Sequence, residues 1–249
     1  MATDLVLLTL AATATALATG LGALPVFWLG VRAERLRPLL WGITVGLMGV
    51  ASIVGLLLPA LDEGTSTDVT IGLAVGVAFL LVSRQFLSGR EVRVGDLQGA
   101  SVTRALLVFG VLLVHSLPEG LAIGTAYASE TKGLGLFVIL AIALQNVPEG
   151  TSVSIPMEAA GFGRRQQFWG AVLTSAPQPV GALFAFVLVE QITPLLPLSF
   201  AFAAGAMLAL VAAELAPEAF ARGHRRAGAV GTLAGAALML GLAAVLGVG

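Results

Sequence analysis

Two pairs of polar side chains interrupt apolar stretches of this chain and have the residue types of a metal-binding site. His115 precedes Glu119 by four residues, and Gln145 precedes Glu149 by the same spacing. Four residues make about one helical turn, so each pair projects from one face of a helix. An imidazole nitrogen with carboxylate and amide oxygens suits divalent ions such as Zn²⁺, Cd²⁺, Fe²⁺ or Mn²⁺. Two carboxylates also balance the charge of one such ion.

The cost of placing these groups supports the same interpretation. Each pair lies inside an apolar run long enough to cross a bilayer, where a carboxylate costs about 2.5–3.5 kcal/mol on insertion scales. Both glutamates stand between a proline and a glycine, so two costly groups share one local context. The alternative is that the polar side chains satisfy one another as a buried hydrogen-bond cluster. We expect a metal site held between two helices by His115, Glu119, Gln145 and Glu149.

The composition is that of an integral membrane protein. Of the 249 residues, 57% are hydrophobic and 11% charged, whereas soluble domains carry about 25% charged residues. There is no Cys, which excludes thiolate metal sites. Apolar runs of about 20 residues predict an all-α protein of eight transmembrane helices. We expect a single domain over 1–249. The eight predicted spans cover residues 5–30, 39–61, 69–88, 103–128, 133–157, 167–189, 195–217 and 227–248.

Basic residues predict the orientation of the chain in the membrane. Twelve of the thirteen Lys and Arg residues lie at one side of the expected bundle, and only Lys132 lies at the other. The positive-inside rule makes the arginine side cytoplasmic, so both termini are expected to be extracytoplasmic. The compact chain suggests a prokaryotic cytoplasmic (inner) membrane as the location, an expectation that rests partly on the resemblance described below. The twelve arginines are residues 32, 35, 37, 84, 90, 93, 104, 164, 165, 222, 225 and 226.

A proline lies inside each of the two polar spans. Pro118 and Pro148 remove the backbone hydrogen bonds to the carbonyls of Val114 and Leu144. Kinked helices with free carbonyls near the bilayer midplane are typical of transporter binding sites. The alternative is that each proline only shapes packing, but a neighbouring glutamate in both spans favours the binding site.

The two polar segments also resemble a known family. His-Ser-Leu-Pro-Glu-Gly at 115–120 and Gln-Asn-Val-Pro-Glu-Gly at 145–150 resemble the fourth- and fifth-helix signatures of the ZIP (Zrt-/Irt-like protein) divalent-metal transporters, especially the bacterial GufA-like branch. Residues 175–181 and 204–218 are similar to the family's sixth and seventh helices. The resemblance implies a 3+2+3 bundle, with helices one to three and six to eight as inverted repeats. It also implies metal import by an elevator-like, alternating-access movement of one bundle against the other.

The resemblance further implies two neighbouring ion sites. The first consists of the four residues named above, and the second would combine the two glutamates with Ser116, Asn146 and Gln178. The family commonly has Asn at the position of Ser116 and Glu at that of Gln178. The second site therefore has no carboxylate of its own, and we expect one strongly held ion.

An eighth polar residue, Glu214, is a candidate exit-side metal ligand near the inner end of the seventh span. The alternative is an interfacial glutamate, solvated or paired with Arg222. His224 lies among arginines in a loop and is expected to be a solvated surface residue.

Three function classes compete: a divalent-metal transporter, a membrane enzyme, and a non-transporting metal sensor or scaffold. An intramembrane metalloprotease would need His-Glu-x-x-His, but the chain has only His115 and His224. We therefore expect no catalytic residues and no cofactor besides the transported ion. Zn²⁺ is the first expectation because it binds more strongly than Fe²⁺ or Mn²⁺, although carriers of Fe²⁺, Mn²⁺ or Cd²⁺ remain alternatives. The expected partners are the metal ion and the lipid bilayer, without nucleic acid, and a homodimer is left open.

Overall fold

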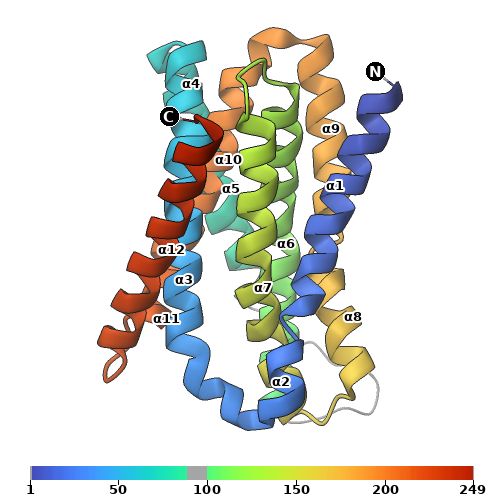
Figure 1. The fold of residues 1–249 in the computed structure, drawn as a ribbon, viewed down its shortest axis with the longest axis vertical. Helices are drawn as coiled ribbons and strands as arrows, with labels where there is room; N and C mark the ends of the chain where they lie inside the picture. The colour runs from blue at the N-terminus through green and yellow to red at the C-terminus, as the bar shows by residue number, and fades with distance from the viewer. Residues whose placement is uncertain (1, 89–99, 249) are drawn as a thin grey trace.

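The structure, a computed structural model, describes residues 2–88 and 100–248, and every regular element in this part of the chain is helical (Figure 1). The helices include long rods that run between the two ends of the molecule and short segments that continue or connect them. They are α1 (Ala2–Leu21), α2 (Leu24–Leu29), η1 (Gly30–Leu36), α3 (Arg37–Ser52), η2 (Ile53–Leu57), α4 (Leu58–Glu63), α5 (Ser66–Ser88), α6 (Ala100–Ala128), α7 (Leu134–Ala159), α8 (Arg164–Thr174), α9 (Pro177–Gln191), η3 (Thr193–Leu195), α10 (Leu196–Leu210), η4 (Val211–Leu215), α11 (Ala216–Ala219) and α12 (Arg225–Leu246).

The chain is a multi-pass membrane protein, as predicted. Seven segments of the described residues are long and apolar enough to cross a bilayer. The first of them, Ala2–Glu63, has 62 residues, about three times the length that one crossing needs. Within it, α1 runs from one end of the molecule to the other, and α3 and α4 return (Figure 1).

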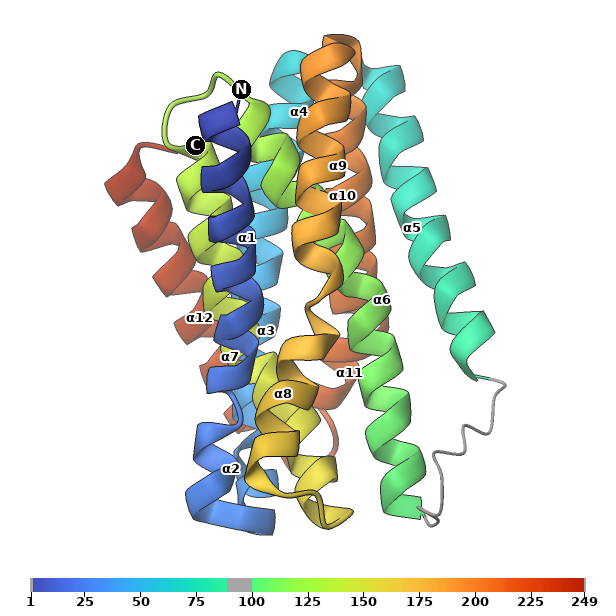
Figure 2. The ribbon, with the colours of Figure 1, turned by 90° about the vertical axis from the view of Figure 1, so that its right-hand side faces the viewer.

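The helices pack in two groups around the centre. In the first group, α6 and α7 pack against each other, α1 lies on α7, and α9 lies on α6. In the second group, α3 packs against α12 and α5 packs against α10. Contacts of α3 with α7 and of α10 with α6 join the groups, and Figure 2 shows α5 at the edge of the second one.

Prolines explain where the helices are interrupted. A proline has no N–H and its ring clashes with the carbonyl four residues before it, so the preceding turn often widens or breaks. Wider π-helical turns, η2 and η4, come just before Pro59 and Pro217. Breaks come before Pro25 and Pro177, between α1 and α2 and between α8 and α9.

The central helices behave differently from these interrupted ones. Both α6 and α7 continue as α-helices through Pro118 and Pro148. The two prolines therefore do not divide the central spans, and the polar pairs remain on continuous helix faces. This continuity keeps each pair at the one-turn spacing that the sequence predicts.

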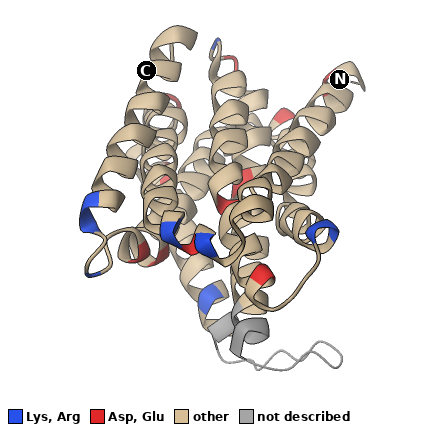
Figure 3. Cartoon of the chain, turned by 60° about the horizontal axis from the view of Figure 1, so that its bottom comes forward, with Lys and Arg blue, Asp and Glu red and all other residues tan. Residues whose placement is uncertain are grey.

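Charged residues mark the two ends of the molecule. Arginines of η1 and of the first turns of α8 and α12 lie at one end, which Figure 3 brings forward. Both termini and the loop that carries Lys132 lie at the opposite end (Figure 1). Arg90 and Arg93 lie outside the described residues. In the described part of the chain, the arginines therefore lie at the end opposite the two termini, as the sequence predicts.

Candidate metal centre

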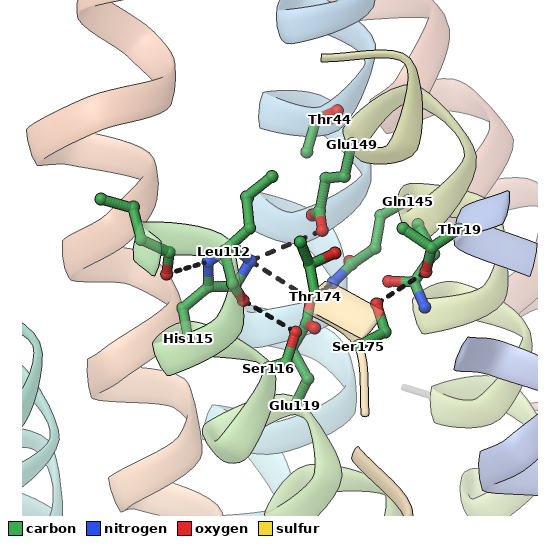
Figure 4. Close-up of polar contacts among 12 residues, drawn as sticks. Thr19, Thr44, Leu112, His115, Ser116, Glu119, Gln145, Glu149, Thr174 and Ser175 are labelled. Carbon is green, nitrogen blue, oxygen red and sulfur yellow. Dashed lines mark hydrogen bonds and ion pairs between the residues drawn. The ribbon is translucent and has the colours of Figure 1, made fainter. Parts of the chain in front are cut away.

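His115, Glu119 and Glu149 converge in the interior, between α6 and α7 (Figure 4). One ligand atom from each side chain lies within 4.8 Å of the other two, and all three residues are buried. His115 Nε2 is 3.5 Å from Glu149 Oε2 and 4.0 Å from Glu119 Oε1. Both separations exceed ordinary hydrogen-bond lengths.

The spacing of these atoms suits a small divalent ion. Nitrogen and oxygen ligands lie about 2.0–2.1 Å from Zn²⁺, so neighbouring ligands of a tetrahedral ion are about 3.3 Å apart. The observed 3.5 and 4.0 Å separations would have to close by about 0.2 and 0.7 Å around such an ion. The ordinary rotations of two glutamate side chains supply that movement.

The imidazole is oriented for metal binding. His115 Nδ1 lies 3.3 Å from the carbonyl oxygen of Val111, one turn earlier in α6. A proton on Nδ1 donates to this carbonyl and leaves the lone pair of Nε2 free. Backbone carbonyls commonly fix the ring of a metal-ligating histidine in this way.

Two amides hold the carboxylate of Glu119. Gln145 Nε2 donates to Glu119 Oε1 at 2.5 Å, and Gln178 Nε2 donates to Glu119 Oε2 at 2.7 Å. Since Gln145 uses its nitrogen here, its oxygen remains available as a fourth ligand. Within the described part of the chain, no hydrogen-bond partner reaches Gln145 Oε1, Glu149 Oε1 or His115 Nε2.

Unpartnered buried polar atoms are rare and costly, about 1–3 kcal/mol each. Here an imidazole nitrogen, an amide oxygen and a carboxylate oxygen share this state, and they come from residues that surround one point (Figure 4). With the imidazole proton on Nδ1, all three are electron-pair donors and cannot satisfy one another. A cation placed among them would satisfy all of them together.

The residues expected for a second ion site have hydrogen-bond partners within the protein instead. Asn146 Nδ2 donates to Gln178 Oε1 at 3.1 Å, and Gln178 Nε2 approaches Asn146 Oδ1 at 3.2 Å. Ser116 Oγ donates to the carbonyl of Leu112 at 2.9 Å. The polar atoms here therefore have partners without an ion, in contrast to those around His115.

Helix α1 contributes residues that sequence reasoning did not single out. Thr15 Oγ1 donates to Gln178 Oε1 at 2.9 Å, and the carbonyl of Thr15 accepts from Asn146 Nδ2 at 2.7 Å. Thr19 shares a 2.6 Å hydrogen bond with Ser175, at the break between α8 and α9. These bonds tie α1 and α9 to the helices that carry the site.

The glycine of each Pro-Glu-Gly segment permits this close packing. A Cβ atom on Gly150 would collide with the carbonyl of Thr19, and one on Gly120 would collide with the carbonyl of Gln178. Small residues let helices approach closely in lipid. The two glycines therefore bring α1 and α9 against the helix turns that carry Glu149 and Glu119.

Replacing Gly150 by alanine is expected to lower stability by about 1–3 kcal/mol, the usual cost of overpacking. The matched control is Gly49→Ala on α3, where an added Cβ meets nothing within 4 Å. Thermal unfolding of both purified variants in the same detergent measures the difference. Equal unfolding temperatures would show that α1 and α7 are not tightly packed at Gly150.

A cavity of about 310 Å³ lies on the arginine side of the site, and it is here named the inner vestibule because the sequence predicts that this side is cytoplasmic. It reaches Val111 and Leu112 on α6. Leu112 precedes His115 by three residues, or about 4.5 Å along a helix. The vestibule therefore ends within one helical turn of the metal centre.

Two cavities of about 570 and 430 Å³ lie at the opposite end of the molecule. They reach no further along α6 than Ala128, nine residues or about 13 Å from Glu119. Between them and the site, Thr125 and Ser199 share a 2.7 Å hydrogen bond that joins α6 to α10. The centre therefore lies much closer to the inner vestibule than to these outer cavities.

Glu214, the candidate exit-side ligand, lines the inner vestibule and not the metal centre. Its Oε1 atom forms an ion pair with Arg84 Nε at 3.3 Å. The alternative pairing with Arg222 is wrong, because α5 brings Arg84 to the carboxylate from a distant part of the sequence. His224 is exposed at the start of α12, as expected of a surface histidine.

The fold and the site together define a polytopic membrane protein with a buried cation-binding group between its two central helices. The sequence profile described as ZIP zinc transporter matches residues 89–243, so the chain belongs to the ZIP family. It is 33% identical to zinc transporter GufA of Myxococcus xanthus over 92% of this chain and 95% of that one.

Two further relatives show how far the similarity extends. Zinc transporter ZIPB of Bordetella bronchiseptica is 34% identical over 92% of this chain and 78% of its own length. A relative from Arabidopsis thaliana is 36% identical over 83% of this chain but only 33% of its own, longer sequence. Similarity to the bacterial proteins thus extends over nearly the whole chain.

Proposed function

We propose that this protein carries a divalent transition-metal ion, first of all Zn²⁺, across the membrane into the cytoplasm. The convergence of three unpartnered donor atoms, from His115, Gln145 and Glu149, carries the proposal. The relatives named as zinc transporters support Zn²⁺ as the substrate. Fe²⁺, Mn²⁺ and Cd²⁺ suit the same ligands and are the alternative substrates.

In this proposal four side chains bind the ion. His115 supplies Nε2, Glu149 and Glu119 supply carboxylate oxygens, and Gln145 supplies its amide oxygen. Two negative charges neutralise the ion, which lowers the cost of holding it at bilayer depth. The amides that donate to Glu119 keep this carboxylate oriented toward the ion.

The topology we propose has eight crossings in one domain over 1–249, with both termini outside the cytoplasm. Seven apolar segments are found, and the first has 62 residues and contains two antiparallel helices. Counting that segment as two crossings gives eight. The arginines at one end support the orientation. Matching interruptions in the two halves support inverted repeats. Helices α1 and α8 both end in a break before a proline, and the π turns η2 and η4 both precede a proline.

The arrangement of the two helix groups supports an elevator-like mechanism. The metal ligands and the amides around them all belong to α6, α7 and α9, which pack with α1 as one group. Such a group can move past α3, α5, α10 and α12 without losing a ligand. The described conformation, with the vestibule one turn from the centre, corresponds to the inward-facing end of that movement.

We also propose that one ion binds strongly. The amide of Gln178 stands where the family's second site would need a carboxylate, and it already donates to Glu119. A second ion would have to displace this hydrogen bond without gaining a negative charge. Two fully occupied metal ions per chain at low micromolar concentration would contradict this proposal.

Uptake into proteoliposomes tests the function. Zn²⁺, Cd²⁺, Fe²⁺ and Mn²⁺ are compared for the original protein and for Glu119→Ala/Glu149→Ala, with folding checked by size-exclusion chromatography. Saturable uptake that the double substitution abolishes is the expected result, and the rates rank the metals. Full activity of the double variant would refute the site.

A folded and correctly oriented protein that moves none of the four metals would favour the alternative function. That alternative is a metal sensor or scaffold with the same fold. Metal binding measured by calorimetry then becomes the deciding observation, because a sensor still needs the His115 and Glu149 donors.

A further inference from the structure

The inner vestibule lies at the boundary between the two helix groups. Its wall on the site's own group is apolar and comes from α6, where Val111 and Leu112 separate it from the metal centre. The opposite wall belongs to the second group and carries the charged residues. Among the described residues, those charged lining residues are Arg37, Arg84, Glu214 and Glu218.

Each lining carboxylate is paired with a lining arginine. Arg84 Nε lies 3.3 Å from Glu214 Oε1, and Arg37 donates to Glu218 Oε2 at 2.8 Å. Arg37 also donates to Glu34 at 2.6 Å. The charged residues that line the vestibule therefore sum to about zero. The negative charge of each lining carboxylate is balanced by an arginine.

Of the two carboxylates, Glu214 lies deeper. It precedes Glu218 by four residues on a chain segment that runs toward the arginine end. Its side chain is 23% exposed, whereas that of Glu218 is 53% exposed. An ion that leaves the centre past Leu112 therefore meets Glu214 before Glu218.

We propose that Arg84 is a built-in competitor for the departing metal ion at Glu214, an inference that rests on the proposed transport function. The guanidinium occupies the carboxylate until an ion arrives, and it returns when the ion leaves. Without it, Glu214 would be an uncompensated carboxylate that retains a divalent ion in the vestibule. With it, Glu214 guides the ion but binds it weakly, so release to the cytoplasm is favoured.

The strength of the ion pair is suited to this role. The Arg84 side chain is 48% exposed, and partly exposed ion pairs contribute little because water screens them. Removing such a competitor is expected to tighten metal binding at Glu214 by up to about fivefold. A fully buried pair would instead resist displacement and block the route.

Equilibrium Zn²⁺ binding to the full chain in detergent tests the proposal without any transport step. Calorimetry is performed in the Glu119→Ala/Glu149→Ala background, so that the central site does not contribute. Arg84→Gln is expected to strengthen the remaining weak site by up to about fivefold. Arg84→Lys, which keeps the charge, should bind like the background, and Arg84→Gln/Glu214→Gln should lose the site.

Arg222→Gln is the matched control, because Arg222 lies at the same end but does not line the vestibule. Its Zn²⁺ binding should equal that of the background. Equal binding by the Arg84→Gln and Arg84→Gln/Glu214→Gln variants would overturn the proposal. If the Arg84→Gln variant does not fold, the Glu214→Gln variant tests the proposal. A weak Zn²⁺ site that remains in the Glu214→Gln variant is not at Glu214, and the proposal is then wrong.

Failure of the proposed function gives a different pattern. A protein that transports no metal can still show the vestibule site and its dependence on Arg84. Conversely, the original protein could take up metal normally and yet show no binding that depends on Glu214. That result would support the transport function and refute only the role of Arg84.

Discussion

Replacing Glu149 by glutamine is expected to reduce Zn²⁺ uptake strongly at low Zn²⁺ concentration while leaving the metal-free protein at least as stable as the original. Uptake falls while the stability of the metal-free protein does not, because the buried charge of Glu149 destabilises the fold but is needed to bind the ion. The residue is buried, and no hydrogen-bond partner among the described residues reaches its Oε1 atom. Glutamine keeps the shape and removes the buried charge.

The loss of binding should be large. Changes to groups that only support a ligand typically cost 10–100-fold in metal affinity, so loss of a charged ligand should cost about 100-fold or more. At a Zn²⁺ concentration about 100 times the original Kd, bound ion stabilises the original protein by about 2.7 kcal/mol. The variant, with a Kd about equal to that concentration, would gain only about 0.4 kcal/mol.

Thermal unfolding with and without Zn²⁺, together with uptake, measures both effects in the same preparations. Glu190→Gln is the matched control, because it makes the same change at an exposed position near the C-terminal end of α9. It should keep the uptake and the Zn²⁺-dependent stabilisation. Retention of both by the Glu149→Gln variant would mean that the ion is held elsewhere.

The convergence of His115, Glu119 and Glu149 was predictable because the polar pairs that contain them are local in sequence. His115 with Glu119 and Gln145 with Glu149 each span one helical turn, and the apolar flanks fix the helices that carry them. The matching Pro-Glu-Gly segments then relate the two helices. Membrane insertion and the grouping of arginines also follow from composition, because bilayer thickness limits the length of each span.

The partners of these residues were not predictable by the same means. A threonine such as Thr15 in an apolar helix looks like a packing residue, since its hydroxyl can bond its own backbone. Only the fold shows that it also bonds Gln178, which lies 163 residues away. The ion pair of Glu214 with Arg84 is likewise a long-range contact, whereas the sequence offered only the nearby Arg222 as an alternative partner.

Replacing Gln178 by glutamate is expected to make the fold depend on metal and to add a second ion. Gln178 is fully buried, and its amide nitrogen donates to Glu119 Oε2 at 2.7 Å. The substitution removes this donor and places two carboxylates in contact. The metal-free protein should lose about 1–3 kcal/mol of stability, the usual cost of an unsatisfied buried group.

A divalent ion should reverse that loss, because it replaces the missing donor with a charge between two carboxylates. Zn²⁺ stoichiometry, measured by calorimetry and by metal analysis after desalting, should rise by one ion per chain. Gln178→Met is the control: it removes the same hydrogen bonds at similar volume but adds no charge. It should be destabilised without rescue by Zn²⁺.

The comparison separates two roles of the amide. If both variants lose stability and only Gln178→Glu regains it with metal, Gln178 keeps the position free of a second ion by donating to Glu119. If neither variant binds an additional ion, Asn146 and Thr15 leave no room for one, and the amide serves only to hold α9 against α1 and α7. Unchanged stability of both variants would contradict either role, because four hydrogen bonds converge on this side chain.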